Sequence, residues 1–272
     1  MSISVICYSG GHSSALVAIE AVRKYGKDNV ILLNHDISPE VEHEDIKRFK
    51  NDVSNYLDVA ITYANMDEWE TMTPLKVSVK KCGFQFQAGN AICTYELKTK
   101  PFYKWLADNF PADFESINNE ITIMYGFDKN EPHRIMRRSG LLSVKGYKTG
   151  FPLTFGERTI GSVEEIGIKQ PKTYQLWKHA NCQGCLKAGR QHWYCVFCLR
   201  PDLWEEAKEV ERIIGHSIIK GIFLEELEPK FTEMRDSKGI CPSEKSEPNA
   251  FWAMVNRVLP EQVSLFPCEC AV

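Results

Sequence analysis

The sequence predicts an α/β protein with an open, mostly parallel sheet that carries helices on both faces. Three observations lead to this prediction. The first 40 residues alternate between a short apolar run, a glycine turn, a helical pattern and a second apolar run. A later run rich in β-branched residues, at 121–125, also ends at a glycine. With 272 residues, 43% of them hydrophobic and 25% charged, the chain has the composition of an ordinary globular protein with a large core.

The first elements follow from hydrophobic periodicity. Residues 2–8 form a short apolar run with β-branched side chains, which predicts a buried strand. From Ser13 the apolar residues recur at helical spacing, and Gly26 is expected to end that helix. Residues 30–34 predict a second strand. Because a strand, a helix and a strand in this order form a βαβ unit, the two strands are expected to be parallel.

The later part of the chain is expected to be mainly helical. Residues 191–215 have an apolar pattern of the helical type, and a final helix is expected at 250–258. The polar residues 230–249 predict a loop between these two helical segments.

The turn after the first strand has the chemistry of an anion-binding site. It comprises Ser9, Gly10, Gly11, His12, Ser13 and Ser14. Glycines let the backbone approach a phosphate closely, the start of a helix offers free N–H groups and a positive dipole, and serine hydroxyls add donors. The alternative is an ordinary helix N-cap made by Ser13 or Ser14. The turn lacks the lysine of a Walker loop and the third glycine of a dinucleotide fingerprint, so neither of those sites is predicted.

This turn resembles the SGGxDS signature of the PP-loop enzymes, which have the adenine nucleotide α-hydrolase fold, although Ser13 replaces the aspartate of the members that cleave ATP. Further segments follow the order found in one branch, the phosphoadenosine phosphosulfate (PAPS) reductase family. They lie at 34–36, 93–101, 126–134 and 151–185. The resemblance covers about residues 3–200. It implies an enzyme that binds ATP, adenosine phosphosulfate (APS) or PAPS and acts in sulfur chemistry.

Several residues are expected to converge on the nucleotide. Ligands of open parallel sheets bind at the carboxyl ends of the strands, beside the point where the strand order reverses. The turn, Asp36 after the second strand and Gly126 after a later strand would meet there. Lys98 and Arg134 would neutralise phosphate or sulfate, and Asp36 would accept a hydrogen bond from ribose or adenine, or hold magnesium. The alternative is that Lys98 and Arg134 are solvated surface charges.

The cysteines supply a second candidate site. Two CxxC motifs are formed by Cys182, Cys185, Cys195 and Cys198. Four thiolates at this spacing suit an iron–sulfur cluster or tetrahedral zinc, and we favour the iron–sulfur cluster. The alternative is that Cys195 and Cys198 are packed residues one helical turn apart. Iron–sulfur members of the resembling family add cysteines of the segment at Cys93, and Thr94 replaces the second of those cysteines here.

The C-terminal segment Cys268-Glu269-Cys270 gives a separate indication. It is similar to the Glu-Cys-Gly ending of PAPS reductases, with Ala271 in place of the glycine. In that family the terminal thiolate attacks the sulfate sulfur, so Cys270 is the candidate nucleophile of a reductase. In an ATP-dependent sulfur transfer, Cys93 or the metal centre would deliver the sulfur instead. The alternative is a frayed terminus with two idle thiols.

These patterns give an expected organisation and environment. We expect a PP-loop-like nucleotide-binding domain at 1–178 and a mainly helical, cysteine-containing region at 179–272 packed on it. The N-terminal residues lack a signal-peptide pattern, and no run of about 18 apolar residues is present, so a cytoplasmic protein without membrane contact is expected.

The expected partners follow from the two versions of the sulfur chemistry. Besides the nucleotide they are a thiol reductant or sulfur donor protein, a nucleic-acid substrate, and a second copy of the chain in a homo-oligomer. The formal charge of −3 gives no overall attraction to nucleic acid and leaves room for a local basic patch. Two alternatives of other classes stay open, a non-catalytic nucleotide sensor and a zinc-dependent nucleic-acid-binding module.

Overall fold

The computed structural model of the protein describes residues 2–156, 158–180 and 182–259. It contains a five-stranded sheet in which every strand is parallel to its neighbours, in the order β3-β2-β1-β4-β5. The strands are β1 (Ile3–Cys7), β2 (Val30–Asn34), β3 (Ile61–Tyr63), β4 (Asn118–Met124) and β5 (Tyr147–Gly150). The chain builds outward from β1 in one direction and then from β4 in the other. The carboxyl ends of β1 and β4 therefore form a topological switch point.

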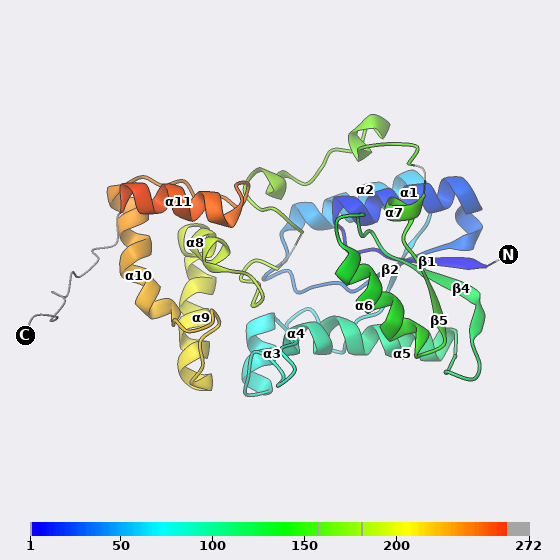
Figure 1. The fold of residues 1–272 in the computed structure, drawn as a ribbon, viewed down its shortest axis with the longest axis horizontal. Helices are drawn as coiled ribbons and strands as arrows, with labels where there is room; N and C mark the ends of the chain where they lie inside the picture. Colours follow the sequence, from blue (N-terminus) through cyan, green and yellow to red (C-terminus); the bar gives the residue numbers. More distant parts are fainter. Residues whose placement is uncertain (1, 157, 181, 260–272) are drawn as a thin grey trace, which may run out of the picture.

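Helices cover both faces of the sheet. One face carries α1 (His12–Tyr25), α2 (Glu44–Leu57) and the short α7 (Pro152–Phe155), and the other carries α5 (Lys100–Asn109) and α6 (Pro132–Ser143) (Figure 1). Phe49 of α2 belongs to the core on the first face, and Leu106 of α5 to the core on the second. Both side chains are fully buried, because each helix turns its apolar stripe toward the strands. The predicted α/β class with an open parallel sheet is confirmed.

The remaining elements lie between β3 and β4 and after β5. The connection from β3 to β4 contains α3 (Pro74–Lys80), α4 (Ile92–Thr94) and a π-helical turn η2 (Tyr95–Thr99) that continues into α5. Short 3₁₀ helices are η1 (Lys27–Asn29), η3 (Val163–Ile166) and η4 (Lys172–Gln175). The C-terminal part contains α8 (Arg190–Leu199), α9 (Pro201–Ile214), α10 (Leu224–Thr232), the π-helical turn η5 (Glu233–Ser237) and α11 (Pro248–Val258).

The C-terminal helices share one hydrophobic core with part of the preceding chain. Trp193 of α8, Trp204 of α9 and Phe231 of α10 are fully buried in it. Leu75 of α3 and Ile92 of α4 belong to the same cluster. The region beyond residue 178 is mainly helical, as expected, and this shared core joins it to the segment between β3 and β4. The domain boundary itself stays a prediction.

The predicted elements agree with the structure where periodicity was strong. The strand at 30–34 is confirmed, and the strand at 2–8 is one residue shorter at each end. The helical pattern at 191–215 is two helices, because Pro201 begins α9 and cannot continue α8. The loop expected at 230–249 is wrong in its first part. There α10 and η5 extend to residue 237, since Phe231 and Met234 are buried in the shared core.

Membrane contact was expected to be absent. Across the part of the chain that the structure describes, no helix is both long and apolar enough to cross a membrane.

Candidate functional site

The turn between β1 and α1 is held in one conformation by close packing. Gly10 has a φ of +76°, in the left-handed region that favours glycine. A Cβ at this position would lie 2.8 Å from Cγ of Lys50, which leaves no room for one. Gly11 differs, because its φ is −89° and a Cβ there would meet its neighbours only at ordinary contact distances, 3.6 Å and more. The first glycine is therefore required by the fold, whereas a Cβ at the second would fit in ordinary contact with Ser9, Tyr174 and Ala180.

The start of α1 has no side-chain cap. Its N-cap is Gly11, which has no capping side chain, and the hydroxyl of Tyr174 accepts from the N–H of His12 in its first turn. Ser14 donates its hydroxyl to the carbonyl oxygen of Gly11 at 2.8 Å, and Ser9 donates to Ser14 at 3.3 Å. The alternative that Ser13 or Ser14 caps the helix is therefore wrong. The N–H groups of the first turn, together with the helix dipole, remain able to bind an anion.

The carboxyl end of β4 lies directly against this turn. A Cβ at Gly126 would be 2.8 Å from the carbonyl carbon of Ser13 and 3.0 Å from the nitrogen of Ser14. Only glycine allows two backbones to approach this closely. The predicted meeting of Gly126 with the turn is thus seen in the structure, at the switch point of the sheet.

His12 joins the turn to the segment that follows α7. Its backbone N–H donates to the hydroxyl of Tyr174 at 3.2 Å, and its Nε2 accepts from the N–H of Val163 at 3.4 Å. Burial lowers the pKa of His12, and the charge of Arg158 lowers it further against the opposing effect of Glu164. A neutral imidazole is the form that can accept the Val163 hydrogen bond. His12 therefore positions residues 163–174 beside the turn.

Asp36, which follows β2, lies in an ion cluster behind the turn. Its carboxylate accepts from Nζ of Lys50 at 3.0 Å and from Nζ of Lys47 at 3.3 Å. Lys50 also binds Glu42, at 2.9 Å, and is only 1% exposed. Burial would raise the pKa of Asp36, but the two ammonium groups outweigh it and lower that pKa. A magnesium ion at Asp36 would have to displace these ammonium groups.

Sequence reasoning missed the partners of Asp36. Burial raises the pKa of Glu42, while the two carboxylates hold the pKa of Lys50 above its usual value despite burial. A signal was present in the sequence, because Lys50 falls on the stripe of α2 that also contains Ile46 and Val53. A lysine on a buried helix face requires an anionic partner.

Lys98 lies within electrostatic reach of three thiols. Burial raises the pKa of Cys182 to about 11; the positive charge of Lys98 opposes this rise, and the Cys185 and Cys93 thiolates add to it. Burial also raises the pKa of Cys93, again against the effect of Lys98. Lys98 stands in the π-helical turn η2, a feature often found at functional sites. Among the described residues no acidic side chain forms an ion pair with it. Cys93, Cys182, Cys185 and Lys98 thus influence one another electrostatically.

Cys195 and Cys198 lie elsewhere, in α8. Burial raises the pKa of Cys195, and its charged neighbours are Glu244 and Cys198 rather than the other CxxC pair. Cys195 is fully buried in the shared core, as the packing alternative expected. Within the described ranges, no three His, Cys, Asp or Glu side chains are arranged to hold a metal ion. The iron–sulfur or zinc centre stays a prediction, and no step of the proposed chemistry below passes through it.

Arg134 begins α6 on the solvent side of the site. Its guanidinium forms an ion pair with Glu131 and lies 4.2 Å from the ring centre of Phe127. The side chain is 64% exposed. It follows β4, as expected. To bind an anion over the turn, its guanidinium would have to break its ion pair with Glu131 or contact Glu131 and the anion together. Cys270 lies outside the described residues.

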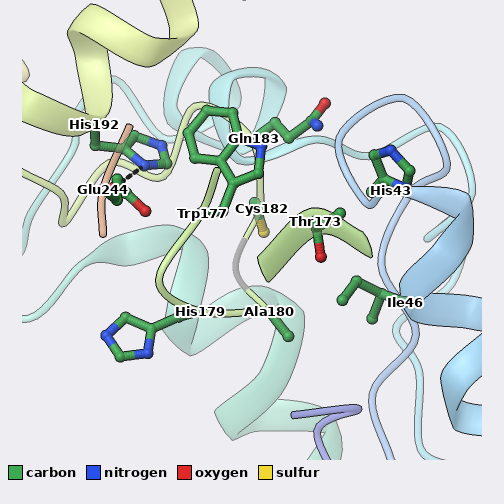
Figure 2. A pocket seen from close by; sticks show the side chains of 10 residues that line it. All are labelled: His43, Ile46, Thr173, Trp177, His179, Ala180, Cys182, Gln183, His192 and Glu244. Carbon is green, nitrogen blue, oxygen red and sulfur yellow. Dashed lines mark hydrogen bonds and ion pairs between the residues drawn. The ribbon is translucent and has the colours of Figure 1, made fainter. Parts of the chain in front are cut away.

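A pocket opens beside the turn, between the sheet domain and the C-terminal helices. Its walls are made by His43, Ile46, Thr173, Trp177, His179, Ala180, Cys182, Gln183, His192 and Glu244 (Figure 2). Ala180 connects it to the turn, since its Cβ is 4.0 Å from the position of a Cβ at Gly11. The hydroxyl of Thr173 is buried and has no hydrogen-bond partner among the described residues. The pocket thus places a free hydroxyl and the thiol of Cys182 next to the glycine turn.

One end of this pocket is closed by a hydrogen-bonded pair. Nδ1 of His192 lies 2.7 Å from Oε1 of Glu244, and Nε2 of His192 accepts from the N–H of Cys185 at 3.0 Å (Figure 2). Burial would raise the pKa of Glu244, but the hydrogen bond and charge of His192 outweigh it and lower that pKa. This pair fixes the CxxC segment against α8.

Comparisons with known proteins add one similarity. No protein-family model matches the chain, and no solved structure matches it. The chain is 28% identical over 216 residues to an uncharacterized nin region protein, ORF290, of Escherichia phage lambda. The match covers 70% of this chain and 67% of the phage protein. It assigns no activity to either protein.

Proposed function

We propose that the chain is an enzyme of the PAPS reductase family, within the PP-loop superfamily, that binds an adenine nucleotide over residues 9–14. The observation that carries the proposal is the start of α1 at the switch point, where the N-cap is a glycine without a capping side chain. The end of β4 packs against the same turn at Gly126. Backbone N–H groups and a helix dipole at such a point favour phosphate or sulfate.

The chemistry proposed for this site is sulfur chemistry, either reduction of a sulfonucleotide or ATP-dependent sulfur transfer. Lys98 is within electrostatic reach of Cys93, Cys182 and Cys185, and Cys182 lines the pocket beside the turn. In a reductase, Cys270 would attack the sulfate sulfur while Lys98 and Arg134 hold the charge of the departing nucleotide. In sulfur transfer, Cys93 would deliver the sulfur. The nucleotide would be ATP for the second reaction and APS or PAPS for the first.

One experiment separates these versions. The protein, purified without oxygen, is incubated with ATP, APS and PAPS in the presence of a dithiol reductant, which supplies the two electrons for sulfite release, and sulfite, AMP and pyrophosphate are measured. The same sample is analysed for iron, sulfide and zinc. A reductase releases sulfite from APS or PAPS, and truncation after Phe266 abolishes that release while nucleotide binding persists, because the tail supplies chemistry and not the phosphate site.

Other outcomes redirect or refute the proposal. ATP cleavage at the full rate in the truncated protein would favour sulfur transfer. Binding without turnover would identify a nucleotide sensor. If none of the three nucleotides binds, the proposed function is wrong.

A further inference from the structure

The surface of α6 differs in charge from the rest of the chain. Residues 129–148 contain six lysines and arginines and a single acidic residue, whereas the whole chain has a formal charge of −3. The cations are Lys129, Arg134, Arg137, Arg138, Lys145 and Lys148. The acidic residue, Glu131, already pairs with Arg134. The segment therefore carries a concentrated positive charge on an acidic protein.

Three of these cations lie over aromatic rings along one flank of α6. The guanidinium carbon of Arg134 is 4.2 Å from the ring centre of Phe127, and that of Arg138 is 5.3 Å from the ring centre of Tyr125. Further along, Nζ of Lys145 is 4.7 Å from the ring centre of Tyr103, which comes from α5. α5 and α6 cover the same face of the sheet (Figure 1). The row begins near the carboxyl end of β4 and follows the helix to its end.

Most of these charges are not neutralised within the protein. Arg137 donates to the neutral side chain of Asn90 at 2.7 Å. In the described ranges, no carboxylate forms an ion pair with Arg137, Arg138 or Lys145. The aromatic rings position Arg138 and Lys145 without cancelling their positive charge, as a carboxylate would.

Apolar side chains are exposed between the cations. Met136 of α6 is 71% exposed, and Val144, the residue directly after α6, is 67% exposed. Leu141 is also exposed. A surface that alternates cations with exposed apolar groups fits a strand whose phosphates and unstacked bases are both accessible. Arginines held against rings also offer planar faces to bases.

We propose that α6 and its flanks, residues 129–148, form a surface that binds single-stranded nucleic acid. The phosphates contact Arg137, Arg138 and Lys145, and the exposed apolar side chains contact bases. The surface runs to the end of β4, so a bound strand lies beside the turn at 9–14. Binding does not require that the turn hold a nucleotide, and the experiment below contains none.

The test measures fluorescence anisotropy of a labelled single-stranded oligonucleotide of about 20 nucleotides, longer than the roughly 4–16 nucleotides that one domain covers. The full chain is titrated at several salt concentrations. The variant Arg137→Gln/Lys145→Gln removes two exposed cations of the surface. The matched control Lys24→Gln/Lys220→Gln removes two exposed cations from elsewhere. Thermal unfolding of both variants checks that the fold is intact.

The wild-type protein is expected to bind with an affinity that falls steeply with salt. The surface variant is expected to bind at least about tenfold more weakly. The slope of log affinity against log salt should also become shallower by about 1.4, because each of the two lost phosphate contacts contributes about 0.7. The control variant is expected to match the wild type. The proposal is overturned if the wild type does not bind at low salt, or if the control loses as much affinity as the surface variant. It is also overturned if a duplex binds as tightly, or if polyglutamate competes equally well.

Discussion

Helices α1 and α8 begin in the same way and lie in different surroundings. Each has a glycine as its N-cap, Gly11 and Gly189, with φ values of −89° and −87°, and neither has a side-chain cap or an acidic residue in its first turn. The start of α1 lies at the switch point of the sheet, with the end of β4 against it. The start of α8 follows the CxxC segment, away from the strand ends. An open helix start is thus a common feature, and its position at the sheet edge is what favours a ligand.

The two helix starts also rest on different polar contacts. Behind the turn before α1, Lys50 binds Asp36 and Glu42 and is almost fully buried. In the first turn of α8, the buried His192 binds Glu244. Removal of the Lys50 ammonium would leave two carboxylates with Lys47 alone. The pair at His192 contains one carboxylate and no buried lysine, so it can be changed at lower cost.

The largest effect is expected from Lys50→Met. Loss of the ammonium leaves Asp36 and Glu42 with Lys47 alone, while the methionine side chain still fills the space beneath Gly10, so the free energy of unfolding should fall by about 3–5 kcal/mol from the unpaired charges. Urea denaturation measures this loss. Adding Glu42→Gln balances the remaining charges, and the double variant should recover a large part of the stability. A double variant no more stable than the single one would contradict the ion-pair account.

A smaller effect is expected from Glu244→Gln. Loss of the charged hydrogen bond to His192 should lower the free energy of unfolding by about 1.5–3 kcal/mol at pH 7. Because the folded-state pKa of Glu244 is lowered, its contribution is present above the ordinary carboxyl value and is lost as the pH falls through the folded pKa. The difference between variant and wild type should therefore shrink in acid.

The matched control for this prediction is Glu247→Gln. Glu247 pairs with Lys178 at the surface and is 74% exposed, so its replacement should change the free energy of unfolding by at most about 1 kcal/mol. Urea denaturation at pH 7 and in acid measures both variants. Equal losses for Glu244→Gln and Glu247→Gln would show that the His192 pair is no more than a surface contact.

Local pattern predicted the parallel sheet and the glycine turn after its first strand well. Near the N-terminus, the strand, the turn and the helix are each determined by residues adjacent in the sequence, so the local pattern of apolar residues and glycines predicts them. The role of Lys50 depends on which way α2 packs, and Thr173 reaches the pocket from a short 3₁₀ helix without periodicity. Neither follows from local pattern.

The cysteine motifs show the limit of spacing as an argument. The pairs Cys182/Cys185 and Cys195/Cys198 have the same two-residue gap. The first pair lies beside Lys98, and the second is packed within a helix. The environment of each cysteine pair depends on tertiary contacts, and the spacing of the cysteines in the sequence does not predict those contacts. The fold class was therefore predictable, and the membership of the candidate site was predictable only in part.

The most direct test of the account places a carboxylate at each of the two helix starts. Gly11→Asp is sterically allowed and should cap α1, changing stability by only a few tenths of a kcal/mol. It should weaken binding of ATP, APS or PAPS by at least about 100-fold, or about 2.8 kcal/mol, because the carboxylate occupies the place of the phosphate or sulfate. Gly189→Asp, which caps α8 in the same way, should leave binding unchanged in calorimetric titration. If all three proteins bind these nucleotides with the same affinity, the start of α1 is not the nucleotide site.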